Sequence, residues 1–289
     1  MNSSEILFLY DALRTNPNGD MDQENKPRMD YDSSTNLVSD LRLKRYVRDY
    51  LVATNDAVEL FVTAEAEDAE ERVQQLLDRE PSSSNPVTDE ELTEITSKCI
   101  DAKLFGAVLG TPGGNSHVHG PVQFNWGYSL NKVDIQESRT TTSSFSGGRG
   151  IGKDYRVKYS FLAFNGGING YIADQTELTD DDLELFDEAM VKSIPFGRSR
   201  SKIGQTPRFY MRVVLNDSVT NLKDLREGIS LAETEGLESI DDVELQTDEL
   251  NEFLASQENL IEKILIWKDD KLDDIEINPD GITVEPLSL

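Results

Sequence analysis

A stretch bounded by two strand-like segments, Tyr128 to Phe164, constrains the fold more than any other part of the chain. Apolar residues alternate with polar ones at both of its ends, which is the periodicity of a strand: Val133 and Ile135 at the first, and Tyr155, Val157, Tyr159 and Phe161 at the second. The middle consists of Thr, Ser and Gly, with the cations Arg139, Arg149 and Lys153. Glycine and hydroxyl residues without a hydrophobic pattern cannot bury a face. The sequence therefore predicts a long β-hairpin whose tip projects from the body.

The cations of this hairpin predict contact with an anion, and a phosphate backbone is the anion that fits best. The alternative is a disordered surface loop without a function, which the composition also permits.

The overall charge opposes a nucleic-acid role, because 55 acidic residues outnumber 28 basic ones and the net charge is -27. The acid can be a solvated coat, as in proteins that work in concentrated salt, or it can be segregated from a local basic face. Residues 217–289 contain 21 acidic and 5 basic residues, whereas residues 192–212 contain 6 basic residues and no acidic one. The charge is sorted along the chain, and this sorting matters more than the total.

The numbers of cysteines and histidines and the hydropathy of the chain argue against a disulfide-bonded secreted protein, a membrane protein and a metalloprotein. Cys99 is the only cysteine, which excludes a disulfide within one chain and fits a reducing cytoplasm. The first residues do not form a signal peptide, and no apolar run approaches the length that spans a bilayer. His117 and His119 are two apart, but there is no further histidine and no adjacent carboxylate. We expect a soluble cytoplasmic protein without a metal or other cofactor and without a membrane partner.

The first third of the chain predicts a strand, a loop and a basic helix. The apolar run from Ile6 to Leu13 indicates a buried strand. The loop that follows is rich in Asn, Asp, Gly and Pro, and its cations are Arg14, Lys26 and Arg28. A helix is expected from Ser39 or Asp40 to about Val52, with an apolar stripe on one face. Its remaining surface carries Arg42, Lys44, Arg45 and Arg48.

Lys44 and Arg48 lie four residues apart on that helix, so they share a face. Like charges at this spacing are mildly destabilising and predict a compensating anion. The alternative is an ordinary solvated face, because Asp40 and Asp49 lie nearby.

Residues 53–120 are predicted to form an insertion carried on the main fold. It contains a short strand at 58–62, helices at 65–79 and 88–98, an apolar strand candidate at 99–109 and a turn-rich connector at 111–121. After the hairpin, residues 165–171 indicate a turn, Thr179 begins a helix, and residues 209–215 form a strong strand candidate. Between the last two lies a Gly-, Pro- and Ser-rich cationic segment with Arg198, Arg200 and Lys202.

Without its insertions, the order is strand, helix, strand, hairpin, strand, helix, strand. This resembles the split βαβ plan, an α+β fold with an antiparallel sheet and helices on one face, which RNA-recognition domains use. The ends of successive elements converge in such a fold, so the four basic segments (14–28, 42–48, 139–158 and 192–212) can line one groove that holds phosphates without reading sequence.

One catalytic motif is nearly present. Gly147, Gly152 and Lys153 are in register with a phosphate-binding P-loop, but Asp154 replaces the Ser or Thr that holds magnesium. A P-loop also precedes a helix, whereas the pattern here continues as a strand. We find no catalytic triad and expect no enzyme active site.

Several motifs together resemble the Cas-seven family, the backbone subunit of type I CRISPR Cascade complexes, in its I-B/I-C branch. They are NPNGDMDQENKPRMD, VSDLRLKRYVRDYL, DAKLFGAVLG, GPVQFNWGYSLNKV and GRSRSKIGQTPRFYMRVVL, spread in the family order over most of residues 5–215. The acidic tail after Asn216 matches only in general pattern.

The resemblance implies an RRM-like palm in residues 1–289, with a helical finger within 53–120, a thumb hairpin at 131–154 and an acidic segment at 216–289 packed on the palm. It implies a ribonucleoprotein for antiviral defence in which copies stack along one CRISPR RNA (crRNA), each thumb displaces a nucleotide, and the bases between thumbs pair with target DNA. Other Cascade subunits, of the Cas-five, Cas-six and Cas-eight types, are the implied partners.

The implied RNA contacts are the cations of the helix, the loops and the hairpin: Arg14, Lys26, Arg28, Arg42, Lys44, Arg45, Arg48, Arg139, Arg149, Lys153, Arg198, Arg200 and Lys202. The high acid content departs from an ordinary RNA-binding surface and suggests a salt-adapted source, where phosphate contacts weaken.

Two other hypotheses remain open from the sequence. One is an RNA-processing endonuclease that uses His117 or His119, and the other is a structural assembly protein that binds no nucleic acid.

Overall fold

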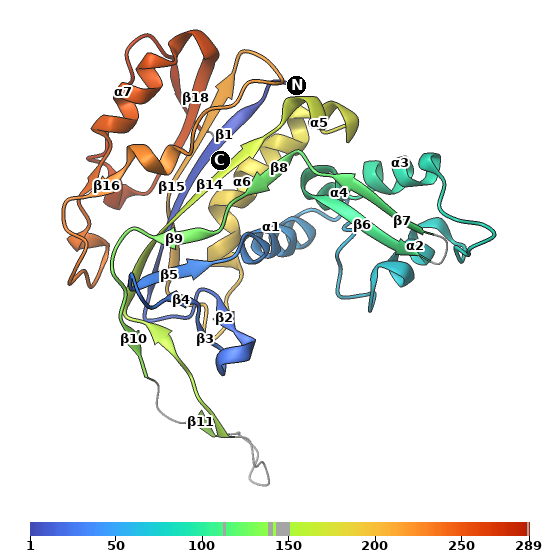
Figure 1. The fold of residues 1–289 in the computed structure, drawn as a ribbon, viewed down its shortest axis with the longest axis horizontal. Helices are drawn as coiled ribbons and strands as arrows, with labels where there is room; N and C mark the ends of the chain where they lie inside the picture. Colours follow the sequence, from blue (N-terminus) through green and yellow to red (C-terminus); the bar gives the residue numbers. More distant parts are fainter. Residues whose placement is uncertain (112–113, 138–140, 143–150, 288) are drawn as a thin grey trace.

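The computed structural model describes residues 1–111, 114–137, 141–142, 151–287 and 289. Its centre is a nine-stranded sheet that is antiparallel except for one parallel pair at an edge (Figure 1). From edge to edge the strands are β19 (Val284–Pro286), β18 (Ile261–Lys268), β15 (Gln205–Leu215), β1 (Ser4–Leu13), β14 (Tyr159–Ile168), β9 (Gly127–Ser129), β5 (Thr35–Val38) and β4 (Met29–Asp30), with β8 (Val122–Phe124) also paired to β14.

The central strand β1 is buried on both faces, which explains its unbroken apolar sequence. Phe8 and Tyr10 enter one hydrophobic core, while Leu7 and Leu9 enter the other. All four are at most 1% exposed. Because successive side chains of a strand point to opposite sides, a strand between two cores needs apolar residues at every position.

The two faces of the sheet are covered by different parts of the chain. One face packs against α1 (Asp40–Thr54), α5 (Gly170–Gln175) and α6 (Asp180–Phe196). The other packs against the acidic segment 216–289, which contributes α7 (Asp248–Ser256) and the short pair β16 (Ser230–Leu231) and β17 (Leu245–Gln246). Figure 1 shows α7 on one side of the central strands and α1 and α6 on the other. Helices therefore cover both faces, rather than one as the sequence order suggested.

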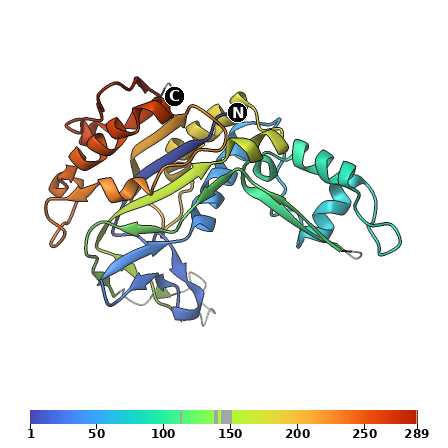
Figure 2. The same ribbon diagram turned by 45° about the horizontal axis from the view of Figure 1, so that its top comes forward.

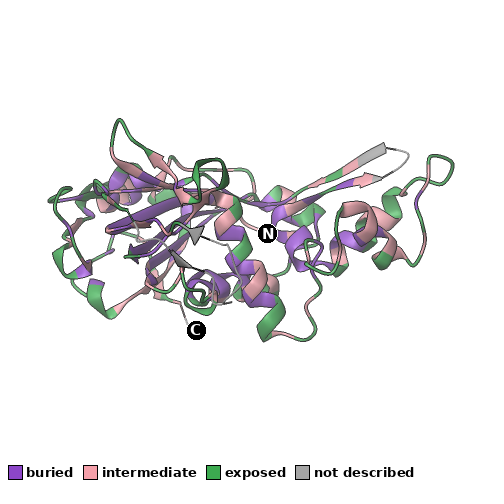
Figure 3. Ribbon diagram, turned by 90° about the horizontal axis from the view of Figure 1, so that it is seen from below, coloured by how far each residue is buried: buried purple, intermediate pink, exposed green. Residues whose placement is uncertain are grey.

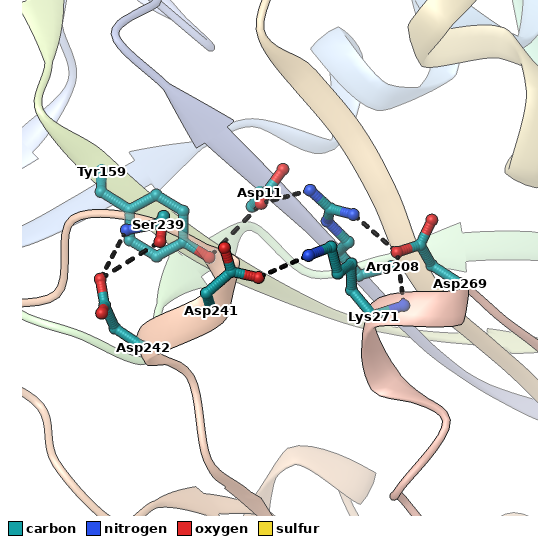
Figure 4. Close-up of polar contacts among 8 residues, drawn as sticks. All are labelled: Asp11, Tyr159, Arg208, Ser239, Asp241, Asp242, Asp269 and Lys271. Atoms are coloured by element: carbon teal, nitrogen blue, oxygen red, sulfur yellow. Dashed lines mark hydrogen bonds and ion pairs between the residues drawn. The ribbon is translucent and has the colours of Figure 1, made fainter.

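A buried polar network fastens the acidic segment to the sheet (Figure 4). Arg208 in β15 donates to Asp11 in β1 at 2.9 Å and to Asp269 of the acidic segment at 2.6 Å. Tyr159 in β14 donates to the same Asp11 at 3.4 Å. The side chain of Asp11 is 4% exposed and that of Arg208 is 13% exposed. Loss of Arg208 would leave Asp11 buried without its cation and would also remove the link to Asp269, so Arg208 helps to hold the acidic segment on the sheet.

Residues 53–120 form a subsidiary unit that extends to one side of the sheet (Figures 1 and 2). It comprises α2 (Ala69–Leu77), α3 (Asp89–Lys98), α4 (Ile100–Phe105), β6 (Gly106–Thr111) and β7 (Gly114–His119). Its small core is separate from the two cores of the sheet, and contains Phe61, Val73, Ile95, Cys99, Ala102, Ala107 and Leu109. Figure 3 shows buried residues extending from the sheet into this unit.

The arms of the segment predicted as a hairpin pair with each other in two short ladders. β10 (Ile135–Gln136) pairs with β13 (Arg156–Val157), and β11 (Thr141–Thr142) pairs with β12 (Ile151–Gly152). Figure 1 shows these arms leaving the sheet from the end opposite to the chain termini. The predicted tip, and with it Arg139 and Arg149, falls outside the described residues.

The helix predictions hold where a cap and a clear apolar stripe coincide. Ser39 caps α1 by accepting from the backbone of Arg42, and Thr179 caps α6 with a capping box. Thr88 caps α3 in the same way. In each case the side-chain oxygen satisfies a backbone N–H that the first helical turn leaves free.

Four short predictions need correction. Residues 100–105 are the helix α4 rather than a strand, and residues 114–119 are the strand β7 rather than a connector. In the predicted turn at 165–171, β14 continues to Ile168 and α5 begins at Gly170. The predicted strand at 58–62 makes one isolated bridge, between Glu59 and Cys99. Short apolar runs do not distinguish helix from strand, which explains the first of these errors.

Candidate nucleic-acid interface

The loop after β1 and the loop before β15 are joined along their backbones. Leu13 N donates to Gly204 O at 2.7 Å, and Asn16 N donates to Ser201 O at 2.9 Å. The ammonium of Lys202 donates to the carbonyl oxygens of Asn16 at 2.5 Å and Pro17 at 3.0 Å. Two cationic segments almost 190 residues apart in sequence are thus held side by side.

The base of the hairpin joins these loops. Arg156 donates to Arg14 O at 3.1 Å and to the Asp154 carboxylate at 2.8 Å. Arg200, from the loop before β15, reaches the same Asp154 oxygen at 3.1 Å. Asp154 therefore receives one arginine from the hairpin and one from the neighbouring loop.

A second contact ties the hairpin to the first loop. Lys153 lies 3.0 Å from Glu24, whose carboxylate also accepts from the Tyr155 hydroxyl at 3.0 Å. The hydrogen bond from Lys153 is the main cause that lowers the pKa of Glu24. The ammonium of Lys26 stands 4.9 Å from the centre of the Tyr155 ring, within the range of a cation–π contact.

Arg42 brings the start of α1 to the same place. Its guanidinium lies over the Tyr46 ring at 4.0 Å, and the Tyr46 hydroxyl bonds to Gln205 at 3.2 Å. The Nε atom of Arg42 is buried without a hydrogen-bond partner. Burial, and then the nearby charge of Arg42, lower the pKa of Lys202 to about 7. Two cations thus lie together at the beginning of a helix, where backbone N–H groups also favour an anion.

We call this group of cations the hairpin-side cluster; its members are Arg14, Lys26, Arg42, Lys153, Arg156, Arg200 and Lys202. Several are well exposed, with 67% of the Arg200 side chain and 56% of the Lys153 side chain accessible. Exposed ion pairs contribute about 0–1 kcal/mol, so a phosphate can replace such a carboxylate at small cost. The cluster can therefore bind a polyanion without sequence readout.

Two further predicted residues lie at the ends of the joined loops. Arg28 pairs with Asp20 at 3.3 Å and stands 5.8 Å from the centre of the Trp126 ring, which is 46% exposed as a residue. Arg198 is exposed and donates to Pro195 O at 3.1 Å. Arg28 is two residues from Lys26 in the sequence, and Arg198 is two residues from Arg200. Both nevertheless make their contacts outside the cluster.

Lys44 is not on the exposed face of α1, as the sequence suggested, but buried. Its side chain is 7% exposed and lies 3.3 Å from Asp40. It also donates to the Gln123 side chain at 2.9 Å and faces the Phe105 ring at 5.5 Å. Burial lowers the pKa of Lys44. The prediction failed because periodicity placed this residue beside the apolar stripe without showing that the insertion covers it.

Arg48 likewise has its compensating anion within the chain. Its side chain is 11% exposed, and its Nε lies 2.8 Å from the Asp101 carboxylate. The guanidinium also faces the Phe105 ring at 5.2 Å. Arg45, by contrast, is half exposed and pairs with Asp49 at 2.7 Å, which is the solvated face that the sequence left open as an alternative.

The structure therefore brings together six of the eleven predicted cations that it describes, namely Arg14, Lys26, Arg42, Lys153, Arg200 and Lys202. Three of the four basic segments and Arg42 of the fourth converge at the hairpin base, while Lys44 and Arg48 face the insertion. The sequence reasoning did not name Glu24 or Asp101 as site residues; it included Arg156 only within the basic segment 139–158, and Asp154 only as a departure from the P-loop. Arg156 alternates with the apolar residues of its strand, and this pattern was the one signal that could have identified it.

The histidine pair and the P-loop-like segment were the other candidate sites in the sequence, and their described residues show no comparable cluster. His117 and His119 stand with ring centres 4.9 Å apart on β7 of the insertion. Among the described residues no group of three or more His, Cys, Asp or Glu is arranged to hold a metal ion. Lys153 leads into the strand β13, whereas a P-loop lysine leads into a helix. Within the described parts of the chain no helix is both long and apolar enough to span a bilayer.

Comparison with known proteins assigns the chain to a family. The family model for CRISPR-associated protein Cas7 matches residues 2–248, so the chain belongs to the Cas7 family. A curated relative, the CRISPR-associated protein Cas7 of Haloferax volcanii, is 29% identical over 303 residues, which cover 94% of this chain and 88% of the relative.

Solved structures share the fold. A chain from a CRISPR RNA-guided surveillance complex in a pre-nicking state matches with a TM-score of 0.61 at 13% identity, covering 98% of this chain and 96% of its own. A chain from another CRISPR RNA-guided surveillance complex matches with a TM-score of 0.57 at 14% identity, covering 97% and 94%. At these identities the likeness concerns the fold alone.

Proposed function

We propose that this protein is a non-catalytic backbone subunit of a type I Cascade interference complex, in which several copies bind one crRNA along its spacer. Membership of the Cas7 family supports this proposal, as does the likeness in fold to chains of RNA-guided surveillance complexes. The guide bases between successive copies then pair with target DNA, and subunits of the Cas-five, Cas-six and Cas-eight types complete the particle.

The observation that carries the proposal is the hairpin-side cluster. The chain carries a net charge of -27, yet cations from four separate segments gather around the hairpin base. Their present partners are the exposed carboxylate of Glu24, the partly buried carboxylate of Asp154 and backbone carbonyls. A phosphate backbone laid beside the hairpin would replace these partners with stronger, charge-assisted hydrogen bonds.

The parts of the fold have corresponding roles in this proposal. The sheet with α1 and α6 is an RRM-like palm, residues 53–120 are the finger, and residues 131–154 are the thumb that displaces one nucleotide per copy. Residues 216–289 pack on the palm. Of the predicted contacts, those of the hairpin-side cluster bind phosphate, with Arg28 and Arg198 at its margins and Arg139 and Arg149 toward the thumb tip. Arg45 stays on the solvated face of α1, paired with Asp49.

The test is to purify the chain at the salt concentration of its host and to ask whether RNA copurifies. The decisive variant is Arg42→Glu with Arg200→Glu, for which we expect RNA retention to fall by about 100-fold or more, since two phosphate contacts become repulsive. The matched control is Lys98→Glu with Lys192→Glu. It makes the same change in charge at two exposed cations that pair with Glu94 and Glu188 outside the cluster.

Three results would overturn the proposal. Equal RNA loss in the cluster variant and in the control would show that only the total charge matters. RNA-free protein in a large assembly would indicate a structural protein that binds no nucleic acid. RNA cleavage that disappears on His117→Ala would indicate the endonuclease.

A further inference from the structure

The junction between the insertion and α1 contains a buried carboxylate that none of the RNA contacts above requires. Asp101, in the first turn of α4, is 1% exposed. It accepts from Phe61 N at 2.6 Å, from Val62 N at 3.0 Å and from Arg48 Nε at 2.8 Å. One side chain thus joins α1, the segment that enters the insertion and the helix that leads out of it.

We propose that Asp101 is a positioning residue that holds the finger on α1 through Arg48, and thereby sets the spacing at which successive copies occupy the guide RNA. This inference rests on the proposed function. It also assigns Arg48 to the structure of the junction rather than to an RNA phosphate.

The energetics of the pair support this assignment. Arg48 uses its Nε for Asp101 and only 11% of its side chain is exposed, so its remaining N–H groups offer little surface to a phosphate. Drawing the guanidinium out toward a phosphate would leave Asp101 as a buried carboxylate without its cation. Breaking one partner of a buried pair is far more costly than exchanging an exposed one. In the hairpin-side cluster, by contrast, Arg200 pairs with Asp154 while 67% of its side chain remains exposed.

Among the described residues few other polar contacts cross this junction, so the pair bears directly on the orientation of the finger. Lys103 in α4 reaches Asp182 at the start of α6 at 3.2 Å, and the Gln123 amide donates to Gly120 O at 3.0 Å. Beside Arg48 a cleft of about 460 Å³ separates α1 from the insertion, with Phe105 and Val118 in its wall. A finger that turned about the junction would widen or close this cleft.

The test is a double-mutant cycle of Arg48→Met, Asp101→Asn and the double variant, with Lys98→Met as a control that removes an exposed pair elsewhere on the finger. Three quantities are measured on the full chain: amide hydrogen exchange in residues 59–111, the affinity for single-stranded RNA at several salt concentrations, and the number of nucleotides bound per protein copy by native mass spectrometry.

We expect both single variants to accelerate exchange in the finger and to weaken ordered assembly on RNA by about tenfold, with a changed number of nucleotides per copy. The double variant should be no worse than either single one, because both remove the same contact. The slope of log affinity against log salt should stay as in the unmodified chain, since no phosphate contact is lost. Lys98→Met should leave all three quantities unchanged.

A contact between Arg48 and a phosphate predicts another pattern. Arg48→Met would then lower the salt slope by about one contact, while Asp101→Asn would bind RNA as the unmodified chain does. That result, or an unchanged number of nucleotides per copy in both variants, would overturn the inference. If the unmodified chain binds no RNA, the proposed function fails, and the exchange data still show whether the pair holds the finger.

Discussion

The hairpin base and the finger junction contain the same kinds of side chain in opposite settings. At the hairpin base the cations are partly exposed, and their partners are the exposed Glu24, the partly buried Asp154 and backbone carbonyls. At the finger junction Lys44 and Arg48 are almost wholly covered, and each has a carboxylate of this chain beside it. Cations of both regions have carboxylate partners within this chain, and the difference lies in how far the cations are buried. A basic motif in a sequence therefore indicates an anion, and only the structure shows whether that anion is a ligand or a neighbouring residue.

The largest expected effect is on stability, at Lys44. Lys44→Glu would place a carboxylate in a buried site beside Asp40, and we expect the free energy of unfolding to fall by about 3–5 kcal/mol. Arg42→Glu makes the same change of charge two residues away at a partly exposed position, and should cost about 1 kcal/mol or less. Urea unfolding at fixed salt measures both. Equal losses would mean that the two regions do not differ in the way described.

The next effect is a pH dependence of RNA binding through Lys202. A phosphate favours the charged ammonium, so a lysine with a pKa of about 7 must take up a proton to bind RNA at higher pH. Affinity should therefore fall by about tenfold between pH 6 and pH 8. Titration of the unmodified chain and of Lys202→Met with single-stranded RNA checks this. A pH dependence of equal size in Lys202→Met would contradict it.

Lys202 also affects folding stability, which should rise with pH, whereas RNA affinity falls with pH. The pKa of Lys202 lies below its ordinary value of 10.5, so between about pH 7 and 10.5 the folded chain binds fewer protons than the unfolded one. Its contribution to the free energy of unfolding therefore rises with pH in that window. The difference between the unmodified chain and Lys202→Met isolates this contribution from those of other groups.

The smallest expected effect is on RNA affinity, at Arg200, a single exposed arginine of the hairpin-side cluster. Arg200→Gln removes one cation of the hairpin-side cluster and leaves its partner Asp154 with Arg156. We expect RNA affinity to fall about five- to tenfold and the salt slope to decrease by about one contact. Fluorescence anisotropy over a range of KCl concentrations measures the slope. An unchanged slope would place Arg200 outside the interface.

The sequence predicted the elements whose signals are local. Ser39 and Thr179 are good caps before apolar stripes, so α1 and α6 could be predicted to within about two residues at their starts. The continuous apolar run of β1 indicated a strand buried on both faces. The family resemblance, which rested on motifs over residues 5–215, agrees with the family match over residues 2–248.

The parts that could not be predicted depend on distant contacts. Nothing near Lys44 in the sequence shows that Gln123 and Phe105 will cover it, since they follow by about 60 to 80 residues. Asp101 looked like one of many carboxylates, because only the fold brings Phe61 N, Val62 N and Arg48 to it. The resemblance implied that 216–289 packs on the palm, but the element order predicted helices on one sheet face only, and the structure shows that this segment covers the second face.

The covered sheet restricts how a long ligand can approach this molecule. An open sheet can stack bases on aromatic side chains along its strands, but here Phe8 and Tyr10 on one side and Phe161 and Phe209 on the other lie inside protein. A strand of nucleic acid therefore meets loops, strand ends, projecting arms and the outer surface of helices such as α1, rather than an open sheet face. Such a protein would follow the path of the chain it binds and leave base edges free for a complementary strand.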